Sequence, residues 1–256
     1  MKKYLWMLVA VCYLSACSKD EEEGPYVPWR PGDQTEETIE LDKATKVMIL
    51  TEQAKNRIVM IDQPTGKVAW EWTAADSGLS AAEQAWFDLP DEAKPVYNRT
   101  CVLVTASGGG VALIRIADKK AMFYAKPGGN PHSAEVLPDG NVVVASSTGN
   151  LLSVYVYNGA DSYVSRPAFT MPVHSAHNVV WDRKRGCLWT ATGAQLLKLA
   201  YNGKRTAPEL TQVRSYDMAA GNTDAHDLAP VCGEDAMYVS CLLYTSPSPR
   251  DRQKSR

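Results

Sequence analysis

The chain has 256 residues, of which 45% are hydrophobic and 22% are charged, and its formal net charge is −2. These values are ordinary for a soluble globular protein with a sizeable core. They do not supply the strongly basic surface that nucleic-acid binding requires, so we expect no nucleic-acid partner.

Residues 1–16 combine Lys2 and Lys3 with an apolar run that is too short to cross a membrane. The run ends in Leu-Ser-Ala before Cys17, which resembles the lipobox of a bacterial lipoprotein. The resemblance implies a signal peptide over residues 1–16, cleavage before Cys17 and acylation of that cysteine. Two or three acyl chains would make a stable membrane anchor. A plain secretory signal peptide is the alternative.

Residues 17–43 begin with an acidic run, Asp20–Glu23, and continue with proline and glycine. This composition predicts a solvated tether. The acidic run after the cysteine is similar to the surface-export signal of Bacteroidetes lipoproteins. That similarity implies a lipid-anchored protein of the outer membrane that faces the cell surface, with the anchor as its only membrane contact. A solvated spacer without export function is the alternative.

Residues 241–256 break the pattern of the preceding chain abruptly. Cys241–Asp251 resembles one reading frame of a transposase adapter used in sequencing libraries, which implies a non-native tail and a natural protein interrupted near Ser240. A genuine basic tail is the alternative. Without the +3 of this tail and the +2 of residues 1–16, the formal charge of −2 becomes −7. An acidic body also argues against nucleic-acid binding.

The remaining region, residues 44–240, is predicted to be almost entirely β-structure. Alternating or short apolar runs bounded by turn residues indicate strands, and we expect these at Val47–Thr51, Arg57–Asp62, Val68–Trp72, Cys101–Ala106, Val111–Ala117, Ala121–Ala125, Val142–Ser146, Leu151–Tyr157, Tyr163–Thr170, Cys187–Thr192, Gln195–Ala200, Gln212–Tyr216 and Ala236–Ser240. Sets of strands recur every 40–55 residues. This period is typical of a β-propeller, with a sandwich as the alternative.

We therefore expect an all-β chain forming part of a β-propeller. The full-length protein is expected to have about six to eight blades, and this chain to stop near the start of the fifth. Cys101, Cys187 and Cys232 lie in or beside apolar strands without CxxC spacing, which predicts small core residues. The segment Ala74–Tyr97 is a longer connection than the others, and long ordered loops often carry function.

Three of the four histidines occupy the same place in the repeat. His132, His177 and His226 each precede an apolar pair, an aspartate-containing turn and a strand that we expect to be innermost in its blade. Loops that enter innermost strands lie at the mouth of a propeller's central channel, so the three imidazoles should converge there as candidate catalytic residues. Around them, the candidate ligand-binding residues are Lys94, His174, Trp86 and Asp227.

Two interpretations of the histidines stay open. Neutral imidazoles can ligate a divalent metal or act as an acid or base, although no short-range metal motif is present and the cofactor is unknown. Alternatively, each histidine bonds a nearby turn carboxylate of Asp139, Asp182 or Asp235, as in WD-type blades. The tryptophans also have two interpretations, as platforms on which sugars stack or as residues packed between blades, and packing is favoured. The residues concerned are Trp70, Trp72, Trp86, Trp181 and Trp189.

The region from Thr45 to Ser240 resembles an uncharacterised β-propeller lipoprotein family of Bacteroidetes. The resemblance rests on KPV, SGGGVALI, GGNPHSAEVLPDGNVVVASSTGN and AHDLAP. The phrase H-x-x-x-x-LP-x-GN is also similar to repeats of arylsulfate sulfotransferase and quinoprotein-like propellers. The sulfotransferase resemblance implies central histidines, one of them nucleophilic, with His132, His177 and His226 as the matching positions.

The sequence thus predicts a cell-surface lipoprotein that binds an extracellular ligand, with a glycan as the foremost candidate, at a histidine-lined channel mouth. The alternative is a sulfotransferase-, lyase- or hydrolase-like propeller enzyme that uses the same histidines. A third alternative is an interaction scaffold, which predicts histidines bonded to turn carboxylates.

Overall fold

The computed structural model describes residues 46–218, 225–231 and 234–241. The expected signal peptide, Cys17, the tether, Cys232 and the tail beyond Cys241 lie outside these residues. In the part of the chain that the structure describes, no helix is long and apolar enough to span a membrane.

The described strands form five antiparallel sheets in which consecutive strands are neighbours. In chain order, the sheets contain β1–β3 (Val47–Glu52, Arg57–Asp62, Lys67–Trp72), β4–β7 (Pro90–Val96, Cys101–Ala106, Val111–Arg115, Ala121–Ala125), β8–β11 (Pro131–Val136, Val142–Ser146, Leu151–Tyr155, Phe169–Pro172), β12–β15 (Val180–Asp182, Cys187–Thr192, Gln195–Tyr201, Leu210–Asp217) and β16–β17 (Ala225–Pro230, Met237–Cys241). The expected all-β class is confirmed.

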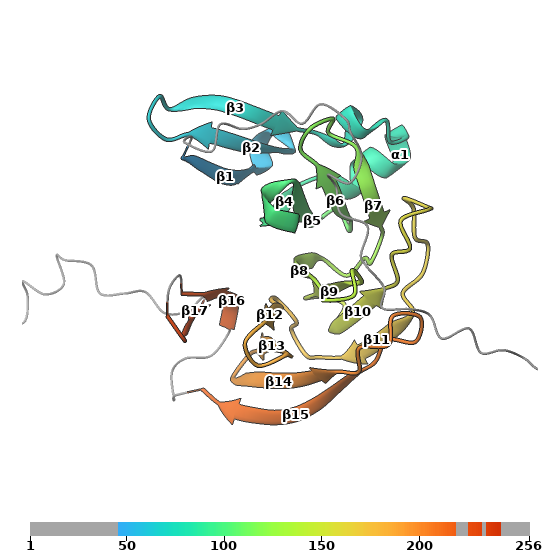
Figure 1. Ribbon diagram of the computed structural model, residues 1–256, viewed down its shortest axis with the longest axis vertical. Coiled ribbons are helices and arrows are strands. Elements are labelled where there is room, and N and C mark those ends of the chain that lie inside the picture. Colours follow the sequence, from blue (N-terminus) through green and yellow to red (C-terminus); the bar gives the residue numbers. More distant parts are fainter. Residues whose placement is uncertain (1–45, 219–224, 232–233, 242–256) are drawn as a thin grey trace, which may run out of the picture.

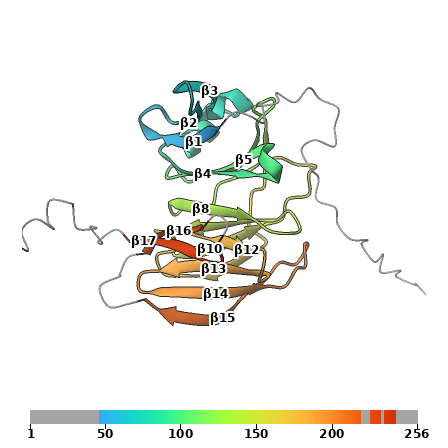
Figure 2. The same cartoon turned by 60° about the vertical axis from the view of Figure 1, so that its left-hand side comes forward.

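The sheets are arranged around a common centre, with β4, β8, β12 and β16 nearest to it (Figure 1). Turning the molecule shows the sheets lying face to face in succession (Figure 2). Neighbouring sheets meet where β5 lies against β8 and β13 against β16. This propeller-like arrangement brings one end of each central strand to the same place.

The central strands correct one sequence prediction. The strands at Val142 and Cys187 were expected to be innermost, but β8 and β12 precede them and are closer to the centre. These central strands escaped detection because they carry polar residues, as in Pro131–Val136 (PHSAEV), and lack a continuous apolar run. His132 and His226 therefore lie within central strands, whereas His177 lies in the segment that leads into β12.

The first sheet has no strand of the central kind among the described residues. β1 lies against β4 as β5 lies against β8, so β1 corresponds to the second strand of the other sheets. Its side chains Met48 and Leu50 are 45% and 42% exposed. The first sheet therefore presents an apolar surface to the solvent.

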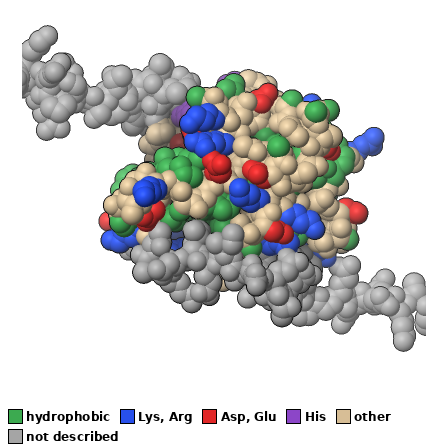
Figure 3. All heavy atoms as spheres, turned by 90° about the horizontal axis from the view of Figure 1, so that it is seen from above, with side chains coloured by type: hydrophobic (Ala, Val, Ile, Leu, Met, Phe, Trp, Pro, Cys, Tyr) green, Lys and Arg blue, Asp and Glu red, His purple; other side chains and the backbone are tan. Residues whose placement is uncertain are grey.

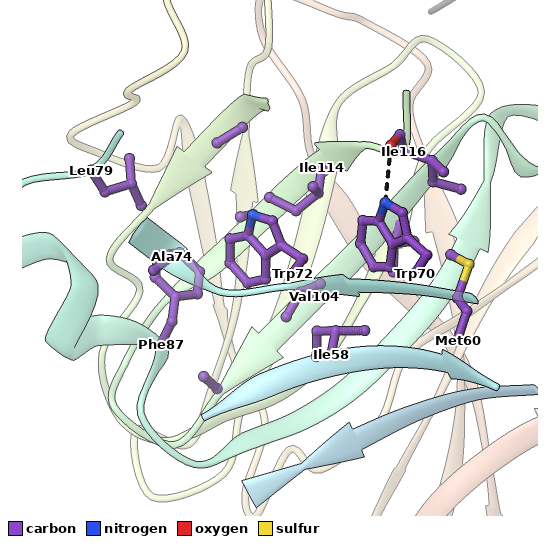
Figure 4. Close-up of a cluster of buried hydrophobic side chains, with 14 residues drawn as sticks. Ile58, Met60, Trp70, Trp72, Ala74, Leu79, Phe87, Val104, Ile114 and Ile116 are labelled. Atoms are coloured by element: carbon purple, nitrogen blue, oxygen red, sulfur yellow. Dashed lines mark hydrogen bonds between the residues drawn. The ribbon is translucent and has the colours of Figure 1, made fainter. Parts of the chain in front are cut away.

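One hydrophobic core lies between the first two sheets. Trp70 and Trp72 of β3 are buried there, and Trp70 Nε1 donates a hydrogen bond of 3.0 Å to the carbonyl of Ile116 (Figure 4). Trp72 meets Phe87 edge to face, with ring centroids 5.5 Å apart. The prediction that these tryptophans pack between sheets is confirmed. Trp189 is also buried, and its Nε1 donates to Asp182.

The described cysteines with side-chain placement, Cys101 and Cys187, are free and buried, as expected of small core residues. Burial raises the pKa of the Cys101 thiol to about 12, so it is held as an unreactive thiol. On the face seen from above, basic and acidic side chains are interspersed and form no block of one sign (Figure 3).

Candidate functional site

The three repeat histidines come together at the centre of the sheets. The ring centroids of His132 and His177 are 4.8 Å apart, those of His177 and His226 are 5.0 Å apart, and those of His132 and His226 are 5.5 Å apart. We call these three residues the histidine cluster. They come from three successive sheets, because His132 lies in β8, His177 just before β12, and His226 in β16. The expected convergence of the imidazoles is therefore present in the fold.

A carboxylate that the sequence analysis missed occupies the equivalent place in the preceding sheet. Register shifts fall at Asp91 in β4, at His132 in β8 and at His226 in β16. Such bulges turn one side chain away from the regular alternation of a strand. Asp91 Oδ1 lies 3.8 Å from His132 Nδ1. Asp91, rather than Lys94, is thus the second sheet's counterpart of the histidines.

A second local feature repeats two residues before Asp91, His132 and His177. Leu89, Asn130 and Ser175 all have left-handed backbone, with φ of 53°, 58° and 52°. Non-glycine residues rarely adopt this conformation, so its recurrence marks a local geometry that the sheets repeat. At Asn130 and Ser175, the left-handed residue also hydrogen-bonds to the histidine that follows.

The hydrogen bonds around His132 determine which ring nitrogen carries its proton. The amide Nδ2 of Asn130 lies 2.9 Å from His132 Nε2. Because an amide nitrogen only donates, Nε2 must accept, and the proton of the neutral ring lies on Nδ1, on the side of Asp91. Asp91 is itself oriented by Ser107, whose Oγ donates to it over 2.7 Å, and by Gln53.

In His177, the hydrogen bond to the backbone leaves the other ring nitrogen available for a ligand. Its Nδ1 lies 2.9 Å from the carbonyl oxygen of Ser175, which only accepts, so Nδ1 carries the proton of the neutral ring. The Nε2 atom of His177 then has a lone pair, and no hydrogen bond to it is found among the described residues. The part of the chain that the structure describes also contains no hydrogen bond to the His226 ring. These two rings retain hydrogen-bonding capacity for a ligand.

The cluster favours neutral imidazole at His132. Burial lowers the pKa of His132, and the neighbouring His177 and His226 lower it further, whereas the charge of Asp91 opposes the shift. A neutral ring offers one donor and one acceptor and can serve as a base.

Lys94 belongs to a layer of contacts between sheets. Its Nζ donates to Ser133 Oγ at 3.1 Å and to the carbonyls of Ala134 and Val179, each at 3.0 Å. The same ammonium is 3.1 Å from Glu92. Although burial alone would lower the pKa of Lys94, the nearby carboxylates, Glu92 first, raise it. The three Nζ hydrogens are engaged in the fold, which leaves no free donor for a ligand.

The other predicted ligand-binding residues are dispersed. His174 is exposed, and its ring makes no contact with the cluster among the described residues; its carbonyl accepts from Thr192. Asp227 is exposed and accepts a hydrogen bond from the backbone N–H of Leu228. Trp86 packs against two tyrosines of the outer strand and a neighbouring connection. Their participation in binding stays a prediction.

The turn carboxylates do not bond the histidines, and that alternative is wrong. Asp139 accepts from Tyr201 and Asn141, Asp182 from Arg185 and Trp189, and Asp235 from Lys184. The physical reason is position: these turns lie at the far end of the central strands from the histidines.

Among the described residues, no group of three or more His, Cys, Asp or Glu side chains is placed to hold a metal ion.

The model of a family of unknown function, DUF6528, matches residues 1–246. The chain belongs to the DUF6528 family. No curated protein matches the chain. The link to lipoproteins or sulfotransferases stays a prediction for this DUF6528 protein.

Solved structures share the fold of this DUF6528 protein at low identity. The mitotic checkpoint complex matches with a TM-score of 0.58 and 11% identity over 76% of this chain and 58% of that chain. The dihydro-heme d1 dehydrogenase NirN matches with a TM-score of 0.52 and 15% identity over 84% and 42%. A protein of unknown function from Bacteroides caccae gives 0.49 and 16% over 77% and 66%. The chain thus spans less than two thirds of each, and the neighbours with TM-scores above 0.5 are propeller-like.

Proposed function

We propose that this DUF6528 protein is a lipid-anchored protein of the outer membrane, facing the cell surface, that binds an extracellular glycan at the histidine cluster. The observation that carries the proposal is the convergence of three imidazoles from three successive sheets. Among the described residues, none of the three rings is bonded to a turn carboxylate. Ligands of propeller-like proteins bind at such central positions.

The hydrogen-bonding groups of the cluster suit a hydroxyl-rich ligand. A sugar hydroxyl both donates and accepts, and a neutral imidazole offers one nitrogen of each kind. The lone pair of His177 Nε2 accepts, the ring of His226 is unengaged among the described residues, and Asp91 accepts. Burial and the neighbouring rings keep His132 neutral, which favours an uncharged ligand over an anion beside Asp91.

The proposal includes a β-propeller of about six to eight blades in the full-length protein, to which the described residues contribute five sheets. Exposed apolar side chains on the first and the last described sheets support the presence of further sheets that cover them. Met48 and Leu50 are exposed on the first sheet, and Tyr238 and Val239 on the last. Apolar surface of this kind is covered in stable soluble proteins.

The test is a screen of the full chain, purified in detergent, against an array of defined oligosaccharides, followed by calorimetry on each hit. His132→Ala and His177→Ala should weaken binding at least about tenfold, the size of one good hydrogen bond to a buried partner. His174→Ala is the matched comparison, because His174 is exposed and its ring makes no contact with the cluster among the described residues: a ligand held by the cluster alone should bind this variant normally, whereas the sequence-based role of His174 predicts a loss. An array without hits, or a hit that both cluster variants bind normally, would contradict the proposal.

Catalysis at the same site is the second candidate function, and the orientation of His177 favours it. Because Nδ1 donates to the carbonyl of Ser175, Nε2 is held as the basic nitrogen and can take a proton from an attacking hydroxyl group. This is the arrangement that a hydrolase-, lyase- or sulfotransferase-like reaction needs of its base or nucleophile.

Mass spectrometry of an array hit after long incubation separates the two functions. An enzyme converts the hit, and His177→Gln abolishes conversion while His174→Gln retains it. A hit that the unmodified chain leaves intact assigns the site to binding alone.

A further inference from the structure

We infer that Trp86, Tyr124 and Tyr163 form a carbohydrate-stacking platform at the same end of the sheets as the histidine cluster but at their outer edge, which extends the site to an oligosaccharide. This inference rests on the proposed glycan-binding function and adds the length of the ligand. The ring centroids are 6.3 Å apart for Trp86 and Tyr124, 5.9 Å for Trp86 and Tyr163, and 5.2 Å for the two tyrosines. We call these three residues the aromatic platform.

Trp86 is fixed in position by glycines of the neighbouring turn. It lies in a 3₁₀ turn after α1 (Ala81–Gln84), in the long connection between β3 and β4. The N–H of Gly110 donates to the Trp86 carbonyl over 2.8 Å. A Cβ atom at Gly108 would lie 2.5 Å from the Ala85 carbonyl oxygen and 2.8 Å from that of Trp86. The connection is thus pressed against the turn, which holds the indole at a defined place.

Tyr163 is brought to the platform by a connection from the next sheet. The chain between β10 and β11 crosses to β7, where Tyr124 N–H donates to the Ser162 carbonyl and Val164 N–H donates to the Tyr124 carbonyl. Tyr163 itself is 43% exposed and belongs to none of the buried clusters. Its neighbour Val164 packs on the core between the second and third sheets and anchors the segment, whereas the ring of Tyr163 stays outside the core and is available for contact.

The orientation of the rings favours a sugar over a cation. The three rings are inclined to one another by 32–42°. Aromatic cages for quaternary ammonium groups surround the cation with several ring faces, whereas rings at shallow angles make an open surface. The apolar face of a pyranose ring stacks on such a surface while its hydroxyl groups stay at the rim.

Polar groups flank the aromatic surface. Tyr124 Oη donates to Glu83 over 2.9 Å, and burial together with Glu83 raises the pKa of Tyr124 to about 12, so the phenol keeps its proton. The Lys126 ammonium lies 5.2 Å from the centroid of the Trp86 ring. The ammonium covers one face of the indole, and Trp86 and Tyr124 also pack on the core between the first two sheets, so the exposed ring of Tyr163 is the main stacking surface. The Glu83 carboxylate and the Lys126 ammonium on either side can bond the hydroxyl groups of a sugar stacked there.

A short path joins the platform to the histidine cluster. Ser107, which bonds Asp91, directly precedes Gly108, which abuts Trp86. Lys126 follows β7, whose last residue Ala125 pairs with Val111 at the start of β6, beside the same turn. The platform and the cluster therefore occupy the same end of the sheets, and one chain of sugars can contact both.

The test uses a length series of an array hit, from the disaccharide upward, with the full chain in detergent. Tyr163→Ala should weaken the longer members about tenfold, the size of one aromatic contact, and leave the disaccharide unchanged. Tyr216→Ala is the matched control, because Tyr216 is 40% exposed on the outer strand β15 and packs on Trp189. Trp86→Phe should give a smaller loss that again grows with ligand length.

The outcomes separate the two proposals. Equal binding by Tyr163→Ala across the length series overturns the platform while leaving a cluster-dependent glycan site intact. If Tyr163→Ala binds the longer oligosaccharides more weakly and the histidine variants bind them normally, the platform stands and the cluster is overturned as the glycan site. An array without hits overturns both.

Discussion

His132 and His177 place their ring centroids 4.8 Å apart although 45 residues of chain separate them. Each is the equivalent residue of its own sheet, and each follows a left-handed residue that hydrogen-bonds to its ring. The repeat of the fold therefore produces the cluster: whichever residue occupies this place in a sheet points toward the same centre. The chemistry of the centre is set by the residue types at one repeated position.

The charge state of His132 should appear in the acid stability of the protein. Its pKa is lowered in the folded state, so the unfolded chain takes up a proton at this ring first as the pH falls below about 6.5. This difference lowers the free energy of unfolding until the folded pKa is also passed. His132→Asn should remove that component from melting temperatures measured between neutral and acidic pH.

Asp91→Asn should act in the opposite direction. The Asp91 carboxylate raises the pKa of His132 against the effect of burial, so its neutralisation lowers that pKa further and extends the acid loss of stability to lower pH. Nitrogen NMR of the imidazole ring during a pH titration measures the shift. An unchanged or raised pKa of His132 would show that Asp91 does not act on it.

The close approach at Gly108 predicts a site-specific loss of stability. Gly108→Ala places a methyl group 2.5 Å from a backbone oxygen, so the connection that carries Trp86 must move. We expect a loss of about 1–3 kcal/mol in the free energy of unfolding. Gly193→Ala is the control, since no atom lies within 4 Å of the added group. Equal stability of the two variants would contradict the close contact between Gly108 and the connection that carries Trp86.

Lys94 should matter to the fold more than to the ligand. Lys94→Met leaves Glu92 and Glu135 without their shared cation, and the two carboxylates are only 18% and 19% exposed. The expected loss is about 3 kcal/mol, the lower end for breaking a buried ion pair, because Lys94 is itself 23% exposed. Thermal melting measures it. Normal stability with lost glycan binding would return Lys94 to the binding site.

The sequence predicts much of the fold because most strands carry apolar runs. Arg57–Asp62 and Cys187–Thr192 were expected with the bounds that the structure has. The central strands were missed because residues such as His132, Ser133 and Glu135 face the centre or the next sheet. Their sequences therefore lack the alternation of apolar and polar residues that indicates a half-buried strand. Tyr163 was assigned to a strand, but its segment crosses to β7, a contact between sheets that no local pattern encodes.

The candidate site was predictable in part. The histidines stand out because His132 and His177 each precede a strand, at Val142 and Cys187, by ten residues. Asp91 stands in the same relation to Cys101 and also follows a proline, as His132 does, so the spacing could have identified it. Lys94 looked available because sequence spacing does not reveal that Ser133 and Val179 accept its hydrogen bonds.

The most direct measurement of the central claim is a ring-nitrogen NMR spectrum of the full chain, recorded with and without a bound oligosaccharide. The chain has four histidines, and His174, with its exposed ring apart from the cluster, is an internal control. We expect the ligand to shift the ring signals of His132, His177 and His226 and to leave that of His174 in place. A saturably bound oligosaccharide that shifts none of the three cluster signals would contradict it.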